Sequence, residues 1–84
     1  MLVRAARYAV EASKALKRHA DAAARIREKI RQYADDPAAL ANNVAMLADP
    51  PYKRLRVEDF RVIFEELEGE VIIIRIGPRS GVYE

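Results

Sequence analysis

The chain of 84 residues contains no cysteine and only one histidine, His19. The absence of cysteine excludes disulfide bonds, thiolate zinc sites and cysteine nucleophiles. A single histidine argues against a multi-histidine metal site and a Ser-His-Asp triad, so we expect neither a metal nor another cofactor. The run of large apolar residues 71–74 is far shorter than the ~20 residues of a bilayer span. No charged start leads into an apolar signal-peptide core, so we expect a cytoplasmic protein without a membrane partner.

What the sequence does contain is enough for one small domain over residues 1–84. Hydrophobic residues make up 51% of the chain, which supports a real core. A domain of this size still buries only about 60% of the surface of its unfolded chain, so its stability margin is small. An obligate partner would be consistent with that margin.

The net charge of +2 is unevenly distributed along the chain. Residues 1–34 hold nine Lys or Arg and three acids, a balance of +6, whereas four glutamates give residues 65–70 a charge of −4. Eleven of the fifteen bases are arginine, which binds phosphate with planar, bidentate geometry. An arginine bias can also come from genome composition, so the pattern raises the expectation of nucleic-acid contact only modestly.

The first half of the chain predicts two helices. Residues 9–34 are rich in Ala, Lys, Arg and Glu and contain no Gly or Pro, a composition that favours helix. Their apolar residues follow two helical stripes that do not join smoothly, which predicts a hairpin of helices at about 10–19 and 21–35. Asp21 is the expected N-cap of the second helix, and Asp36-Pro37 is expected to end it.

The second half of the chain predicts strands. Residues 36–51 form the expected connector, with no more than a short helical turn at 37–41. Three antiparallel strands are expected at residues 52–57, 60–67 and 70–76. A first strand at residues 2–8 must join them to protect the sheet edge. The expected fold is α+β in the order β-α-α-β-β-β, a four-stranded antiparallel sheet with the helical hairpin on one face.

Alternation along the strands gives the most informative local prediction. If Glu58-Asp59 is a two-residue hairpin turn, Arg56 lies opposite Arg61, and Arg54 shares their face of the sheet. Directly opposed arginines repel each other, so an anionic ligand such as phosphate would offset the repulsion. The alternative is that these arginines extend into solvent or pair with Glu65 and nearby carboxylates.

Three further residues have ordinary structural explanations at this level. Arg79 leaves the last strand in a Gly-Pro-Arg turn, where an arginine is usually solvated. Tyr83 lies near the terminus, where a tyrosine usually packs on the sheet edge. His19 falls at a helix end, where a structural role or an interaction with the helix dipole is favoured over catalysis.

Three ordered segments of the chain form a recognisable pattern: the basic stretch ARIREKIRQYADDP at 24–37, NNVAML at 42–47, and YKRLRVEDFRVIFEELEGEVIIIRIGPRSGVY at 52–83. This pattern resembles the RelE/ParE superfamily of bacterial toxins. The first two segments are similar to the basic second helix of these toxins and the turn after it, and the third is similar to their C-terminal half. The resemblance covers essentially the whole chain. It implies a toxin of a type II toxin–antitoxin module with the RelE-like, microbial-ribonuclease-like fold.

The resemblance implies two alternative activities. RelE-like members enter the ribosomal A site and cut mRNA, whereas ParE-like members bind DNA gyrase and stall it without nuclease chemistry. The sheet arginines and the spacing of Arg79 and Tyr83 look more like the RelE-like branch, a ribosome-dependent mRNA endonuclease (mRNA interferase) that inhibits translation. The implied partners are the ribosome, mRNA and an acidic, helical antitoxin in the bacterial cytoplasm, with gyrase as the alternative target.

Matching positions imply roles for single residues. Arg61 corresponds to the arginine that stabilises the transition-state phosphate. Arg79 corresponds to an arginine placed as proton donor or leaving-group stabiliser, and stabilisation is favoured because arginine stays protonated in proteins. Tyr83 corresponds to a tyrosine that stacks on a base. The implied RNA- and phosphate-binding residues of the preceding strand are Arg54, Arg56 and Lys53.

The sequence departs from the family pattern at two positions. Pro78 stands where many members have a histidine before the tail arginine, and proline removes both a possible acid/base group and a backbone donor. Tyr52 stands where some members have a catalytic lysine, and alternation directs Lys53 to the opposite face. No general base is therefore assigned, and whether the chain is an enzyme stays open.

Overall fold

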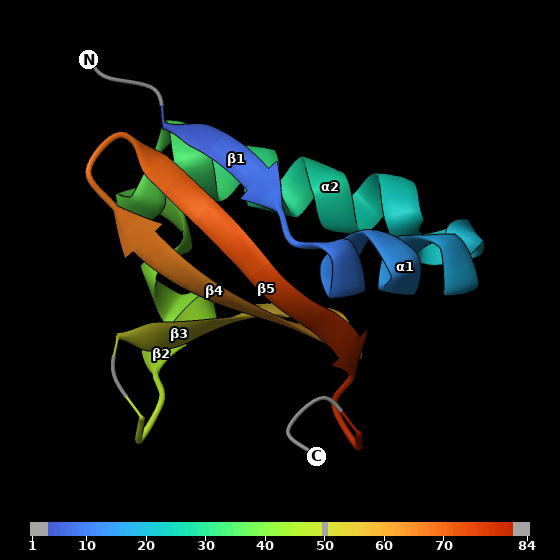
Figure 1. Cartoon of the computed structure of the whole chain (residues 1–84). Helices are drawn as coiled ribbons and strands as arrows, with labels where there is room; N and C mark the ends of the chain where they lie inside the picture. The colour runs from blue at the N-terminus through green and yellow to red at the C-terminus, as the bar shows by residue number, and fades with distance from the viewer. Residues whose placement is uncertain (1–3, 50, 82–84) are drawn as a thin grey trace.

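The structure is a computed structural model that describes residues 4–49 and 51–81. Its elements in chain order are β1 (Ala5–Tyr8), α1 (Val10–Arg18), α2 (Ala20–Asp35), the 3-10 helix η1 (Pro37–Asn43), β2 (Val44–Met46), β3 (Tyr52–Val57), β4 (Phe60–Leu67) and β5 (Glu70–Pro78). Figure 1 shows α1 and α2 next to each other along β1 and β5. The predicted α+β class, with two helices packed on a sheet, is confirmed.

The sheet has the strand order β1-β5-β4-β3-β2 and differs from the prediction in two details. It has five strands, because Val44–Met46 pairs with β3, and β1 runs parallel to β5. A three-residue strand is too short to show alternation in the sequence. The parallel pairing is allowed because the connection from β1 back to the sheet runs through two helices and needs no tight hairpin.

The two helices meet at a single residue, His19, which has φ −114° and ψ 51°. The predicted N-cap at Asp21 is wrong, because α2 begins at Ala20 and Asp21 falls within its first turn. An acid in the first turn still stabilises the helix, because its negative charge interacts favourably with the positive end of the helix dipole. In the described part of the chain, no helix is long and apolar enough to cross a membrane.

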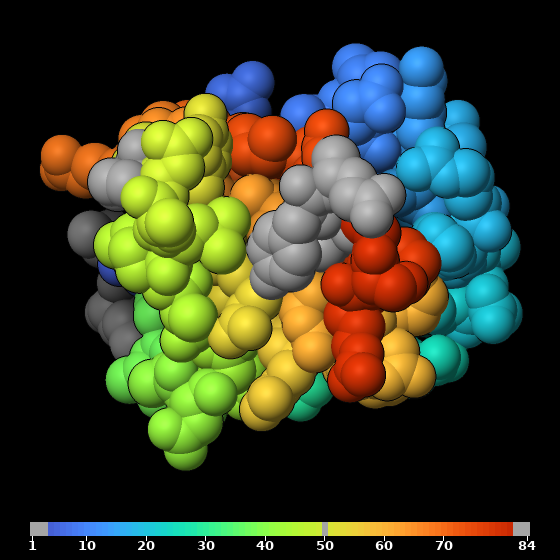
Figure 2. Space-filling view, turned by 90° about the horizontal axis from the view of Figure 1, so that it is seen from below, coloured from blue at the N-terminus to red at the C-terminus, as the bar shows by residue number. Residues whose placement is uncertain are grey.

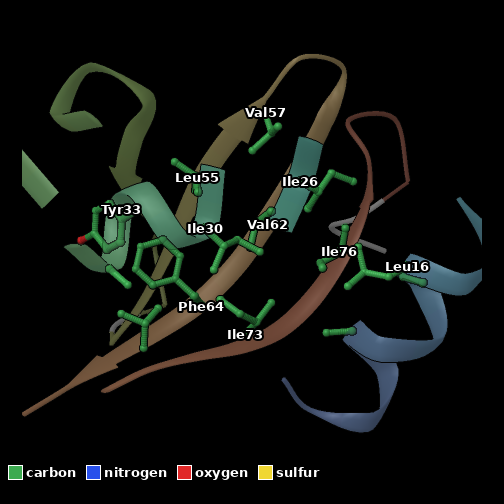
Figure 3. Packing of buried hydrophobic residues seen from close by; sticks show 14 of the residues in the cluster. Leu16, Ile26, Ile30, Tyr33, Leu55, Val57, Val62, Phe64, Ile73 and Ile76 are labelled. Carbon is green, nitrogen blue, oxygen red and sulfur yellow. The ribbon is translucent and has the colours of Figure 1, made fainter. Parts of the chain in front are cut away.

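The core lies between the helices and one face of the sheet. Alternation on β3 and β4 is confirmed, since Leu55, Val57, Val62 and Phe64 are all at most 2% exposed. Figure 3 shows these side chains meeting apolar residues of both helices and of β5. The helical and β5 residues labelled there are Leu16, Ile26, Ile30, Tyr33, Ile73 and Ile76. The residues that alternate with them on β3 and β4 face away from the helices.

A register shift in β5 changes which residues face the core. Ile63 pairs with Arg75 but Phe64 pairs with Ile73, so Ile74 is the extra residue of a bulge. Ile73 and Ile76 are therefore both buried, although they lie three positions apart along one strand. Without the bulge, alternation would direct Arg75 into the core. With it, Arg75 shares the face of Ile63, on the side opposite the helices.

The β3–β4 turn contains a strained residue that can be tested. Glu58 has φ 56°, a left-handed conformation that costs a residue with a Cβ about 1–2 kcal/mol. We expect Glu58→Gly to be more stable than Glu58→Ala by about 1 kcal/mol. Both variants lose the carboxylate that pairs with Arg25, but only glycine relieves the strain. Urea denaturation of the two variants measures the difference, and a more stable alanine variant would contradict the positive φ.

Candidate functional site

On the sheet face opposite the helices, strands β3, β4 and β5 carry four arginines, which we call the arginine face: Arg54 and Arg56 on β3, Arg61 on β4 and Arg75 on β5. Arg7 of β1 lies on the same side of the sheet, where its Nη1 donates to Oε2 of Glu70 at 3.4 Å. Arg56 lies directly opposite Arg61, as predicted, and Ile63 lies between Arg54 and Arg75 in the register. Figure 2 shows side chains of β3 and β4, yellow and orange, uncovered between the green segment and the red C-terminal segment.

Among the residues that the structure describes, few acids lie near Arg54, Arg56 and Arg61 of the arginine face. Strand alternation places two acids on this face, Glu65 and Glu70, and Glu70 already accepts a hydrogen bond from Arg7. Within residues 4–49 and 51–81, Glu65 forms no ion pair with Arg54, Arg56 or Arg61. The alternative that Glu65 pairs with these arginines is therefore not observed, and the face presents positive charge.

Arg61 is held in place by the turn that precedes it. Its Nη1 donates to the carbonyl oxygen of Glu58 at 3.0 Å and to its neighbour Phe60 at 2.9 Å. A guanidinium has five N–H donors, so the Nε and Nη2 donors remain for a ligand. Because the group is oriented before a ligand arrives, it loses little conformational freedom on binding.

Arg54 has a hydrogen-bond donor without a partner among the described residues. Its Nε is shielded from solvent and donates no hydrogen bond to any residue that the structure describes. A buried polar group without a partner costs about 1–3 kcal/mol. A cationic group with an unmet donor, beside other arginines, favours the approach of an anion.

The chain after β5 brings Arg79 to the same end of the sheet. The backbone N–H of Arg79 donates to the carbonyl oxygen of Asp59 at 2.8 Å, which joins the Pro78-Arg79 turn to the tip of the β3–β4 hairpin. Arg79 is exposed and lies close along the chain to Gly77, the register partner of Arg61. The structure therefore brings Arg61 and Arg79 together, whereas Tyr83 lies outside the described residues.

Lys53 is separated from the arginine face, as alternation predicted. It lies on the helix side, where its Nζ contacts Oε1 of Glu66 at 3.1 Å. The same oxygen accepts a hydrogen bond from the Tyr33 hydroxyl at 2.7 Å, and Arg4 Nε lies 3.0 Å from Oε2. We call these four residues the Glu66 cluster. Because the ammonium group of Lys53 already contacts Glu66 on the helix side, its position gives no support to the expected role of Lys53 in phosphate binding.

The Glu66 cluster changes the acidity of two of its members. Burial alone would raise the pKa of Glu66, but hydrogen bonds from Tyr33 and Lys53 and the charges of Lys53 and Arg4 lower it overall. The pKa of Tyr33 is raised, first by burial and then by its hydrogen bond to the Glu66 carboxylate. Both shifts favour an ionised Glu66 bonded to a protonated Tyr33.

Sequence reasoning missed Arg75 as a member of the arginine face. Its place there depends on the bulge at Ile74, and the continuous apolar run before it contains no alternation that could mark an extra residue. His19 has the structural contact that was predicted, since its ring meets that of Phe60 edge-on at 5.0 Å. Among the residues described, no group of three or more His, Asp or Glu is placed to hold a metal ion.

Comparisons with solved structures support the fold. The chain is similar to a chain of the archaeal RelE–RelB complex from Pyrococcus horikoshii OT3, with a TM-score of 0.77 and 19% identity over 96% of this chain and 100% of that one. It is also similar to a chain of the E. coli DinJ–YafQ toxin–antitoxin complex, with a TM-score of 0.74 and 15% identity over 99% and 100%. At these identities the likeness establishes the RelE-like fold alone.

A comparison with family models goes further. The comparison with curated proteins gives no match. The family described as "ParE toxin of type II toxin-antitoxin system, parDE" matches residues 4–83, almost the whole chain. This protein therefore belongs to the ParE toxin family of type II toxin–antitoxin systems, within the RelE/ParE superfamily.

Proposed function

We propose that this toxin is a ribosome-dependent mRNA endonuclease that inhibits translation. The observation that carries the proposal is the arginine face, where Arg56 and Arg61 lie directly opposite each other. Neither guanidinium group forms an ion pair with a residue in 4–49 or 51–81. A phosphate between such opposed groups stabilises them, because charge-assisted hydrogen bonds replace the repulsion. A single RNA strand supplies such phosphates in series.

Two arginines suit the chemistry of RNA cleavage. The 2′ oxygen attacks the neighbouring phosphorus and the 5′ oxygen leaves, which produces a 2′,3′-cyclic phosphate and a 5′ hydroxyl. Arg61 is placed to stabilise the added negative charge, since backbone carbonyls already orient its guanidinium. Arg79, at the same hairpin tip, suits the departing oxygen.

The proton transfers are assigned to the ribosome. The attacking 2′ hydroxyl must lose a proton and the leaving 5′ oxygen must gain one. The four strand arginines and Arg79 are not proton acceptors at neutral pH, and Pro78 cannot exchange a proton. Ribosomal groups would therefore complete the site, which explains a requirement for bound ribosomes. Base stacking by Tyr83 stays a prediction.

We further propose a cognate antitoxin as the partner, as in the two complexes whose folds match. The basic helices favour an acidic protein, but less strongly than the sequence suggested. Arg25 and Arg31 are already paired with carboxylates of this chain, and the cations left for a partner include Lys17 and Arg18 on α1. Co-purification with a small acidic protein encoded by the neighbouring gene tests this proposal.

Expression without the antitoxin tests the activity. We expect growth arrest, loss of translation and new 5′ ends inside translated regions, mapped by primer extension on cellular mRNA. With purified components, the same ends should form on ribosome-bound mRNA and not on free mRNA. Supercoiling by DNA gyrase should be unchanged at the same toxin concentration. Intact messages during growth arrest would contradict the proposal.

The second candidate is a non-catalytic inhibitor of DNA gyrase. The family description favours it, since it names ParE, and so does an arginine face with no histidine. In that case the toxin would stall supercoiling by purified gyrase and leave mRNA intact on the ribosome. The two assays together give opposite results for the two candidates.

A further inference from the structure

A cavity of about 330 Å³ lies between the C-terminal end of α1 and β5. We call it the α1–β5 cavity. Its volume falls at the lower end of the range for small-ligand sites, ~300–1,000 Å³. Its walls include Arg18 and His19 from the end of α1 and Arg75 and Gly77 from β5. The helical junction and the bulged strand, which are far apart in sequence, therefore build one concave surface.

The charge of the cavity favours an anion. Arg18 contributes a cation, and Glu11, the acid on the wall, already lies 3.9 Å from Nζ of Lys14. Arg18 is exposed and forms no ion pair with the part of the chain that the structure describes. The ring of His19 is oriented by its edge-on contact with Phe60 and adds a hydrogen-bonding group at a fixed place.

The cavity is continuous with the arginine face. Arg75 belongs to both, and Gly77, which lines the cavity, is the register partner of Arg61. Arg56, Arg61 and Gly77 lie in one row across β3, β4 and β5. Two strand spacings cover about 10 Å, a distance that a short oligonucleotide spans. An RNA strand that crosses this row from β3 toward β5 reaches the cavity.

We propose that the α1–β5 cavity is a second anion subsite, which binds the phosphate of a nucleotide next to the one held by Arg56 and Arg61. This inference rests on the proposed RNA-directed function and adds a direction to it, since the strand then runs across β4 and β5 to the end of α1. Arg18 and His19 contact the phosphate from the helical side. Arg18 is thus a binding residue outside the sheet.

A salt titration with matched variants tests the subsite. The probe is a single-stranded 2′-O-methyl RNA pentamer, which cannot be cut through its 2′ oxygen, and the full chain is used throughout. We expect Arg18→Gln to weaken binding about 3- to 10-fold and to reduce the slope of log K against log salt by about 0.7, the loss of one phosphate contact. Lys17→Gln removes the same charge from the neighbouring exposed position, does not line the cavity, and should keep the wild-type slope.

The results separate the subsite from the function. If Arg18→Gln and Lys17→Gln behave alike while Arg56→Gln weakens binding, the subsite is wrong and the RNA-binding face stands. If the wild type does not bind the pentamer, the subsite is wrong, whereas the ribosome-dependent function still depends on the cleavage assay with purified ribosomes. NMR signals of the His19 ring should move with the pentamer. If inorganic phosphate alone moves them at the same concentration, the cavity is a free-anion site and the proposal is overturned.

Discussion

Replacing Arg61 with alanine should lower the rate of ribosome-dependent mRNA cleavage by about 10²–10³-fold, the usual cost of removing one preorganised donor from a developing oxyanion. The hydrogen bonds from Nη1 to Glu58 and Phe60 fix the guanidinium in the ground state. Its remaining donors can therefore bind the phosphate as charge builds up. The measurement is single-turnover cleavage of mRNA on purified ribosomes saturated with toxin. The same loss should relieve growth arrest in cells.

Two matched variants show whether the effect of Arg61→Ala is local. Arg61→Lys keeps the charge but loses the bidentate fork, so its rate should fall between those of alanine and wild type. Arg31→Ala removes an exposed arginine of α2 that pairs with Glu28 and Asp35, and it should cleave normally. A folded Arg61→Ala, Arg79→Ala double variant that still cuts mRNA at the wild-type rate would refute the proposed chemistry.

Loss of folding is not the expected reason for the Arg61 effect. The side chain lies on the solvent side of the sheet, opposite Arg56, and like charges at directly opposed positions destabilise a strand pair. Removing one of them relieves that repulsion and offsets the two lost hydrogen bonds to turn carbonyls. The free energy of unfolding should therefore change little, within the roughly ±0.5 kcal/mol typical of surface substitutions.

The placement of the β3 and β4 arginines could be predicted because alternation and a short turn determine it. Once Glu58-Asp59 is a two-residue turn, the pairing of Arg56 with Arg61 follows, and the structure has that register. Buried Leu55 and Val57 then require Arg54 and Arg56 to face away from the helices. No tertiary information is needed for these assignments.

The placement of Arg75 of β5 on the arginine face could not be predicted in the same way. Ile72, Ile73 and Ile74 are equally apolar, and nothing in their side chains marks Ile74 as the residue without a partner. The bulge is a property of how β5 pairs with β4, and it determines the face of Arg75. The α1–β5 cavity depends in turn on that bulge and on the packing of α1.

On the helix side of β3, the sequence again predicts only part of the structure. Alternation correctly directs Lys53 away from the arginines, but it does not identify the partner that holds it. Glu66 is a diagonal neighbour of Lys53 across β3 and β4. The packing of α2 adds Tyr33 to the same carboxylate, and the segment before β1 adds Arg4. Residues 65–70 carry four glutamates, and the structure shows that one of them, Glu66, joins three other elements of the chain.

Replacing Glu66 with alanine should lower the free energy of unfolding by about 2 kcal/mol, because the Tyr33 hydroxyl and two cations lose a shared, largely enclosed acceptor. For a domain of this size the melting temperature should fall by on the order of 10 °C. Glu68→Ala, an exposed acid two residues along the chain, is the matched control and should change stability by less than about 0.5 kcal/mol. Equal stability of the two variants would show that the cluster contributes nothing.

The pH dependence of Glu66→Gln tests the electrostatic part of this prediction. The pKa of Glu66 is lower in the folded state than its ordinary value. Its contribution to stability is therefore fully present above the unfolded pKa of about 4.3 and is lost as the pH falls through the lowered folded value. The stability gap between wild type and Glu66→Gln should be widest at pH 7 and should narrow below pH ~4. A gap independent of pH would mean that packing, rather than charge, accounts for the loss. Because the cluster lies on the face opposite the arginines, folded Glu66→Gln should bind the RNA pentamer as the wild type does, which separates stability from function.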